Sequence, residues 1–220
     1  MRKPTDTREK LLETAIALIW QSSYASVGVA EICKQAGVTK GSFYHYFTSK
    51  AELFYEACQH HWQVKKKELD AIYSPSFTPL QQLENLIRFV IDQQESEAVD
   101  ENPVSGCPFF TAGAQSGCSE LKVRQAAQEM SDNAVTYNVA LVRNLKAEGL
   151  LNGDPAPQQI GRLLHEFIQG LLVTGRVYRS LELVKQDLRE GIYRLVDLKA
   201  EYRCQPVADE APVVAAPLPA

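Results

Sequence analysis

The chain has 220 residues, with 23 Lys or Arg against 27 Asp or Glu, so its formal net charge is −4. Hydrophobic residues make up 45% of the sequence, which excludes disorder as a description of the whole chain and predicts a buried core. No apolar run approaches the roughly 20 residues that span a bilayer, and the first ten residues lack the apolar stretch of a secretory signal. Five cysteines form no disulfide framework, so we expect a cytoplasmic chain with reduced thiols. Taken alone, the acidic balance argues against a nucleic-acid partner.

The N-terminal quarter of the chain contains three helix signals in succession. Apolar residues recur at helical spacing from Leu12 to Trp20. A shorter apolar pattern, Val29–Ala36, is closed by Gly37. Thr39 can then cap a short helix that runs to about Phe47.

Capping residues and helix breakers place the later helices. Ser49 and Glu52 match a capping box, in which the hydroxyl and the carboxylate each accept a hydrogen bond from a free backbone N–H. Convincing strand signals are absent, so the sequence predicts an all-α fold of about nine helices. The later helices are expected over these segments: Ser49 to about Ile72, onward from a cap at Thr78, about Pro108 to Gln115, from a cap at Ser119 to Gly149, onward from Asp154-Pro155, and about Glu182 to Tyr202.

The segment Val29–Phe47, VAEICKQAGVTKGSFYHYF, has the features of a helix-turn-helix. Two short helices that cross steeply need a small residue at their contact, which Cys33 provides, and Gly37 takes the turn. Phe43 should face inward together with Phe47. The side chains left outside are hydrogen-bond donors suited to phosphates and base edges: Lys40, Ser42, Tyr44 and His45.

This segment resembles the tetracycline-repressor-like (TetR) family of bacterial transcription regulators. The resemblance covers residues 8 to about 58 closely, whereas the remainder agrees only in being helical and of the right length. Val27-Gly28 and Ser23 depart from the family pattern, but neither change touches the second helix of the motif. The resemblance rests on the following residues: Tyr24, Ile32, the run Ala36–Phe47 (AGVTKGSFYHYF), Ser49-Lys50 and Leu53.

The resemblance implies a three-helix DNA-binding domain at residues 1–50, followed by a larger helical effector-binding and dimerisation domain at 51–203. Four prolines in the last 16 residues predict a disordered tail at 204–220. The family works as a homodimer whose recognition helices enter successive major grooves of a near-palindromic operator on double-stranded DNA. Carried over residue by residue, the DNA contacts are expected at these positions: Thr39, Lys40, Gly41, Ser42, Tyr44, His45 and Lys50.

The distribution of charge removes the objection raised by the acidic total. Between Lys34 and Lys50 there are three lysines and no acidic residue, so this face carries a local charge of +3. Residues 1–60 hold seven basic and six acidic residues, which leaves −5 for the rest of the chain. The negative sign therefore belongs to the second domain.

In the family, the C-terminal helices bind a small effector, and its binding spreads the two DNA-reading domains. Aromatic residues that could line such a pocket, or else belong to an ordinary core, are Trp62, Phe89, Phe109, Phe110, Tyr137, His165 and Phe167. Three of these, Phe110, Tyr137 and His165, are our candidates for effector binding.

Cys107 and Cys118 are candidates for a covalent sensor. Cys107 precedes a short helix, whose free amides and dipole lower the pKa of a nearby thiol. A Gly-Cys pair here resembles a subset of the family, some members of which sense electrophiles or oxidants through a cysteine. A non-covalent organic effector, with both cysteines merely packed, is the alternative. We expect no cofactor and no metal site, because the adjacent His60 and His61 point different ways on a helix and no Cys-x-x-Cys occurs.

These features together predict a homodimeric DNA-binding repressor, controlled by a small effector, that is neither an enzyme nor a membrane protein. The alternative is an all-α cytosolic ligand carrier or enzyme, but the sequence has no phosphate-binding glycine loop, His-Glu-x-x-His or nucleophile elbow. The last two helices are expected to form the dimer interface. Glycines at 161, 170 and 175 would let a second copy approach one helix, and the apolar residues of the other helix from Leu183 to Val196 would pack against it.

Overall fold

The computed structural model describes residues 4–96, 103–115 and 120–203, and within these ranges the regular secondary structure is helical apart from one isolated β-bridge, Leu151–Leu198. This confirms the all-α prediction. No described helix is both long and apolar enough to cross a bilayer. The elements are α1 (Pro4–Gln21), α2 (Val29–Ala36), α3 (Lys40–Tyr46), α4 (Lys50–Ile72), α5 (Pro79–Ser96), α6 (Pro108–Gln115), α7 (Leu121–Ala147), α8 (Pro157–Tyr178), α9 (Leu181–Val196) and a 3₁₀ turn, η1 (Ala200–Tyr202).

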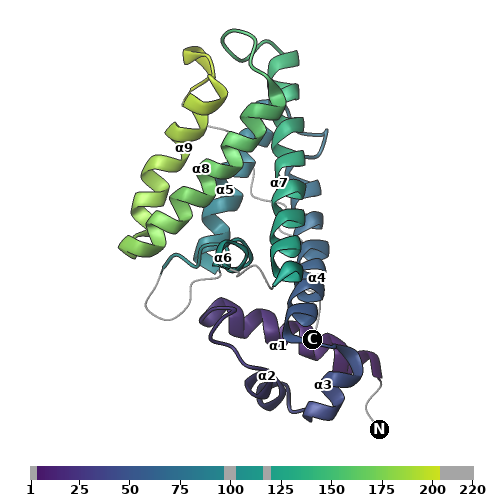
Figure 1. Cartoon of the computed structure of the whole chain (residues 1–220). Coiled ribbons are helices and arrows are strands. Elements are labelled where there is room, and N and C mark those ends of the chain that lie inside the picture. The colour runs from purple at the N-terminus through teal and green to yellow at the C-terminus, as the bar shows by residue number, and fades with distance from the viewer. Residues whose placement is uncertain (1–3, 97–102, 116–119, 204–220) are drawn as a thin grey trace.

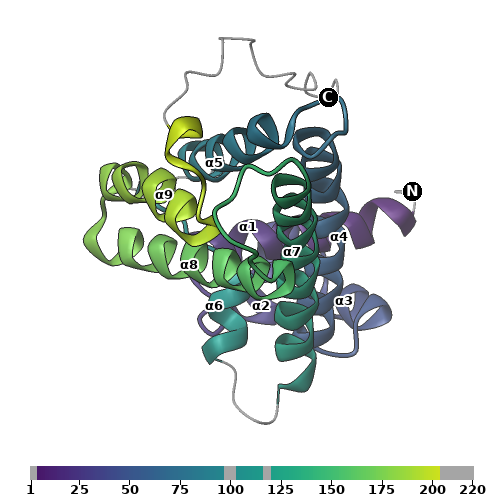
Figure 2. The same ribbon diagram turned by 90° about the horizontal axis from the view of Figure 1, so that it is seen from above.

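The helices form a small head (α1–α3) and a larger body (α5–α9), which are connected by the long helix α4 (Figure 1). α4 begins in the head and runs along α7 into the body, while α6 lies between the two parts. Viewed from above, α8 and α9 lie side by side on the flank of the body away from α4 (Figure 2). The head is therefore held to the body by α4 and α6 rather than by a linker.

The buried side chains form two apolar clusters, one inside the body and one centred on the head. The head cluster does not end at α4, because Phe109 and Ala112 of α6 and Val123 and Ala126 of α7 belong to it. A displacement of α6 or of the start of α7 must therefore repack part of the core of the head, since close-packed interiors transmit strain.

Most of the predicted helix ends are confirmed. α6 spans the expected residues, and Gly149 follows α7 with a left-handed φ of 67°. Thr78 and Gln81 form a complete capping box, with N···O distances of 2.9 and 3.3 Å. The second capping box is confirmed only in part: Ser49 Oγ accepts from the amide of Glu52 at 3.1 Å, but the Glu52 carboxylate accepts from the amide of Thr48.

Three predicted ends are wrong. α8 begins at Pro157 instead of Asp154, because a residue that precedes a proline is driven out of the helical region, and Ala156 is accordingly extended. The last α-helix ends at Val196 instead of Tyr202, where the chain turns at Asp197 to pair with the segment after α7. The N-cap of α7 is Glu120, whereas Ser119, like the predicted tail at 204–220, lies outside the described residues.

Two of the three glycines of α8 are used within the chain. A Cβ at Gly161 would lie 2.5 Å from Val139 Cγ2 of α7, and one at Gly175 would lie 2.5 Å from Val184 Cγ2 of α9. A Cβ at Gly170 would meet no atom of the described chain within 4 Å. Of the three glycines predicted to let a second copy approach, only Gly170 therefore remains available for that role.

We expect Gly161→Ala to lower the free energy of unfolding by about 1–3 kcal/mol, because the added methyl group overpacks the contact between α7 and α8. Gly170→Ala, on the same helix, is the matched control and should leave stability unchanged or raise it by up to about 1 kcal/mol through helix propensity. Urea denaturation followed by circular dichroism measures both. An unchanged denaturation midpoint in Gly161→Ala would contradict the close approach.

Candidate nucleic-acid interface and effector cavity

The helix-turn-helix forms as the sequence predicts. Gly37 adopts φ 64° after α2, and the amide of Val38 donates to the Cys33 carbonyl at 2.9 Å. Phe43 and Phe47 are buried, with their ring centroids 5.8 Å apart. These two rings fix the inner face of α3 and leave its opposite face to solvent.

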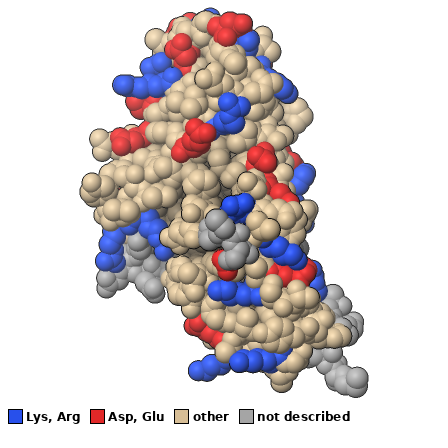
Figure 3. Space-filling model, in the orientation of Figure 1, with Lys and Arg blue, Asp and Glu red and all other residues tan. Residues whose placement is uncertain are grey.

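The outer face of α3 carries most of the predicted DNA contacts. Lys40 and His45 are exposed, and 58% of Tyr44 is accessible. Thr39 caps α3 by accepting from the amide of Ser42 at 3.1 Å, and the two hydroxyls lie 3.1 Å apart. In the view of Figure 3, Lys and Arg side chains lie along the lower edge of the head, below its acidic groups. The outer face of α3 thus combines charged, hydroxyl and aromatic side chains.

Lys50 differs from the other predicted contacts, because its ammonium has partners inside the chain. Its Nζ donates to the carbonyls of Tyr24 and Val27 at 2.9 and 3.1 Å and lies 4.1 Å from the centre of the Tyr24 ring. Burial lowers the pKa of this lysine. Its phosphate contact stays a prediction, while its hydrogen bonds tie α4 to the segment between α1 and α2.

A cavity of about 190 Å³ lies where the head meets the body. Four predicted effector residues line it together: Cys107, Phe110, Tyr137 and His165. Trp62, Phe89 and Phe109 line it as well. Phe167 does not, because its ring packs on Gly191 of α9, where a Cβ would lie 2.1 Å from it. Cys118, the fifth candidate, lies outside the described residues.

Trp20 and His61 are cavity residues that sequence reasoning missed. The Trp20 ring lies 5.1 Å from the His61 ring and 5.2 Å from the Phe109 ring. Its indole nitrogen is buried without a hydrogen-bond partner among the described residues. Trp20 belongs to α1, so the head itself forms part of the cavity wall. Helical spacing marked Trp20 as apolar, but no sequence pattern indicates which helix an apolar face will meet.

The cavity wall is largely apolar, and its two histidines favour the neutral form. Burial lowers the pKa of His61 to about 4, with Lys65 adding to the effect, and burial also lowers the pKa of His165. Burial and the neighbouring Asp70 carboxylate raise the pKa of Tyr137 to about 12. Lys65, also on the wall, pairs with Glu68 at 3.4 Å. Such a cavity suits a guest that is small and uncharged.

Cys107 lies at the cavity wall, directly before α6, in a loop that is held from two sides. Gln94 Oε1 of α5 accepts from the amide of Gly106 at 2.9 Å and from the Ser105 hydroxyl at 3.1 Å. Arg176 of α8 donates to the Ser105 carbonyl. Gly106 adopts φ 72°, which side chains other than glycine rarely allow. A group added to Cys107 would therefore enlarge a constrained segment next to α6.

The known proteins to which this chain is similar are described as transcription regulators. The family described as "Bacterial regulatory proteins, tetR family" matches residues 11–57. The HTH-type transcriptional repressor NemR of Escherichia coli K12 is 26% identical over 188 residues, covering 83% of this chain and 90% of NemR. An uncharacterized HTH-type transcriptional regulator of Bacillus subtilis, YxaF, is 24% identical over 187 residues, covering 83% of this chain and 93% of YxaF.

Solved structures share the fold. The reduced form of E. coli NemR superposes with a TM-score of 0.77 at 23% identity, covering 89% of this chain and 99% of that one. A regulatory protein TetR from Rhodobacter sphaeroides gives a TM-score of 0.72 at 23% identity, covering 86% and 96%. The head, its exposed recognition helix and these likenesses define a helix-turn-helix transcriptional regulator. Residues 11–57 match the TetR family, and a solved regulatory protein TetR shares the fold over 86% of the chain.

We expect Lys50→Met to lower the free energy of unfolding by about 1–3 kcal/mol, because two carbonyl groups lose a charged donor. Lys67→Met removes an exposed lysine from the same helix and should leave stability unchanged. Thermal denaturation at matched protein concentration compares the two. If both variants unfold like the wild type, the contacts of Lys50 contribute nothing to holding the head.

Proposed function

We propose that the chain is a homodimeric repressor that binds a near-palindromic operator through α3 and leaves it when an effector occupies the cavity. The observation that best supports this proposal is that Trp20, a residue of the head, forms part of the cavity wall. A guest that displaces this ring acts on the DNA-reading part directly. A ligand that favours one arrangement of the head over another shifts the population between them, which is all that release requires.

The proposed DNA contacts divide by their geometry. Lys40, Tyr44 and His45 are exposed side chains that contact phosphates or base edges. Thr39, which caps α3, and Ser42, whose amide it caps, contact a phosphate, with Gly41 allowing close approach of the backbone. For Lys50 we propose a positioning role through its hydrogen bonds to the Tyr24 and Val27 carbonyls, in addition to the predicted phosphate contact.

We assign the proposed dimer interface to α8, because this helix presents an exposed apolar face. Gly170, Val173 and Val177 follow at spacings of three and four residues and so share one face. Val173 and Val177 are 44% and 73% exposed, and the neighbouring Tyr178 is 70% exposed. By contrast, four apolar residues of α9 that we expected at the interface lie in the chain's own core: Val184, Leu188, Ile192 and Val196. A second copy would cover the apolar face of α8.

The proposed effector is a small, uncharged and mainly apolar molecule, because the wall is aromatic and burial disfavours the charged forms of both histidines. Covalent control is the second candidate, favoured by the position of Cys107 on the same wall. There a thiolate would add to the double bond of an electrophile, forming a C–S bond while the adjacent carbon takes up a proton.

The DNA proposal is tested on the duplex that lies beside the chain's own gene. We expect Lys40→Ala to weaken binding about tenfold and to reduce the slope of log affinity against log salt by about 0.9, the share of one phosphate contact. Lys67→Ala removes the same charge from an exposed position near the C-terminal end of α4 and should bind like the wild type. Fluorescence anisotropy at several salt concentrations measures both.

The same titration with a half-site duplex tests the dimer, because a dimer that reads two grooves loses most of its affinity when one half-site is removed. Wild-type protein that binds scrambled DNA as tightly as the flanking duplex would contradict the operator proposal. Equal affinity for the half-site and the full site would contradict the proposed symmetry.

The covalent mode is tested by treating operator-bound protein with N-ethylmaleimide. If Cys107 is the trigger, the reagent releases the wild type from DNA but leaves Cys107→Ser bound. Cys204→Ser, which removes a thiol far along the sequence, is the control and should behave like the wild type. Equal release of wild type and Cys107→Ser would exclude Cys107 and leave the non-covalent effector.

A further inference from the structure

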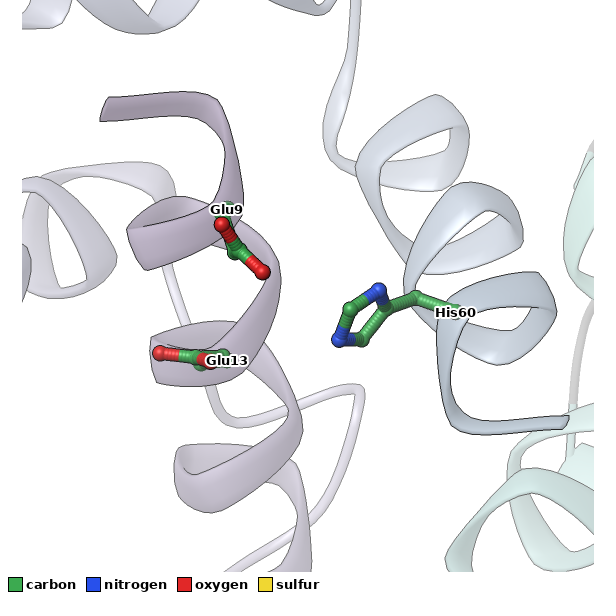
Figure 4. A group of neighbouring side chains, drawn as sticks. All are labelled: Glu9, Glu13 and His60. Carbon is green, nitrogen blue, oxygen red and sulfur yellow. The ribbon is translucent and has the colours of Figure 1, made fainter. Parts of the chain in front are cut away.

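Three metal-ligating side chains meet between α1 and α4, outside the surfaces described above. Glu9 and Glu13 are one turn apart on α1, and His60 of α4 turns its imidazole toward that helix (Figure 4). One ligand atom from each residue can be chosen so that all three lie within 4.8 Å of one another. Among the described residues this is the one such group of three or more His, Cys, Asp or Glu side chains.

Their surroundings leave these ligands available. No hydrogen bond or ion pair between described residues engages Glu9, Glu13 or His60, whereas the neighbouring Arg8 already pairs with Glu56. Two carboxylates at positions i and i+4 of a helix repel one another. A divalent cation between them would convert this repulsion into attraction.

We propose that Glu9, Glu13 and His60 form a site for a divalent transition-metal ion of the zinc type. Zinc accepts one imidazole nitrogen and two carboxylate oxygens at about 2.0–2.2 Å, which places ligand atoms about 3.4 Å apart. Closing from separations of at most 4.8 Å requires small torsional changes, which the exposed glutamates allow. The mixed nitrogen and oxygen set favours zinc over magnesium, which prefers oxygen alone.

The proposed metal site is open to solvent, as expected for an ion that has three protein ligands and one water ligand. An open groove of about 530 Å³ is lined by Glu13, His60 and Trp20, so water can complete the coordination shell. Trp20 also lines the effector cavity, as do His61 and Lys65, so the groove at the metal site and the cavity share three residues. Of the adjacent histidines of α4, His60 turns toward α1 and lines only the groove, whereas His61 lines both the groove and the cavity.

A bound ion would fasten the head to the connecting helix, since two ligands come from α1 and one from α4. Binding to the folded state alone raises the apparent stability of the chain. The site goes beyond the proposed DNA function and does not depend on it, because its test measures metal binding.

The test is calorimetric titration of tag-free, chelator-treated protein with zinc sulfate in a thiol-free reducing buffer. We expect one zinc ion per chain in the wild type and a higher melting temperature with zinc than without it. His60→Gln and Glu13→Gln should bind zinc at least about tenfold more weakly, because each removes a ligand. Glu148→Gln, an exposed acid near the end of α7, is the matched control and should bind like the wild type.

Two further titrations serve as controls: magnesium chloride with the wild type, and zinc sulfate with Cys107→Ser. Magnesium that binds as tightly as zinc would overturn the role of the imidazole. Zinc affinity that survives both ligand substitutions but disappears in Cys107→Ser would assign the ion to the thiol and overturn the proposal. Absence of zinc binding in the wild type would also overturn it. Circular dichroism checks that the variants, both changed near the surface, keep the helical fold.

Discussion

The packing of Phe109 is the contact on which the rest of the structure depends. This fully buried ring, from α6 of the body, lies 5.2 Å from Trp20 of α1 and 5.7 Å from Phe54 of α4. It belongs to the apolar cluster of the head while it lines the cavity of the body. Together with Ala112, Val123 and Ala126, this ring makes the two parts share one core, so neither can repack alone.

Sequence patterns predicted the local structure well where the decisive forces are local. Gly37, Thr39 and Gly149 act through their own backbone or the next turn, and each is placed as expected. The largest error in a helix end arose where a distant segment decides. Helix α9 stops at Val196 because the chain beyond it pairs with residues near 151, which no periodicity reveals.

The candidate sites also differ in whether nearby or distant residues determine them. The exposed face of α3 could be predicted, because a short helix with two inward aromatic residues has only one outer surface. The cavity could be predicted only as a set of aromatic residues in the second half, since its wall combines six helices and includes α1. For the same reason the adjacent His60 and His61 argued against a metal site in sequence, although ligands from different helices can still converge.

The position of Trp20 has a consequence for spectroscopy. The chain contains two tryptophans, Trp20 and Trp62, and both line the cavity. Its indole fluorescence therefore originates entirely from the wall of one chamber, where His61 lies against one of the emitters. The protein carries a built-in optical reporter at the junction of head and body, and its emission follows what enters there without any added dye.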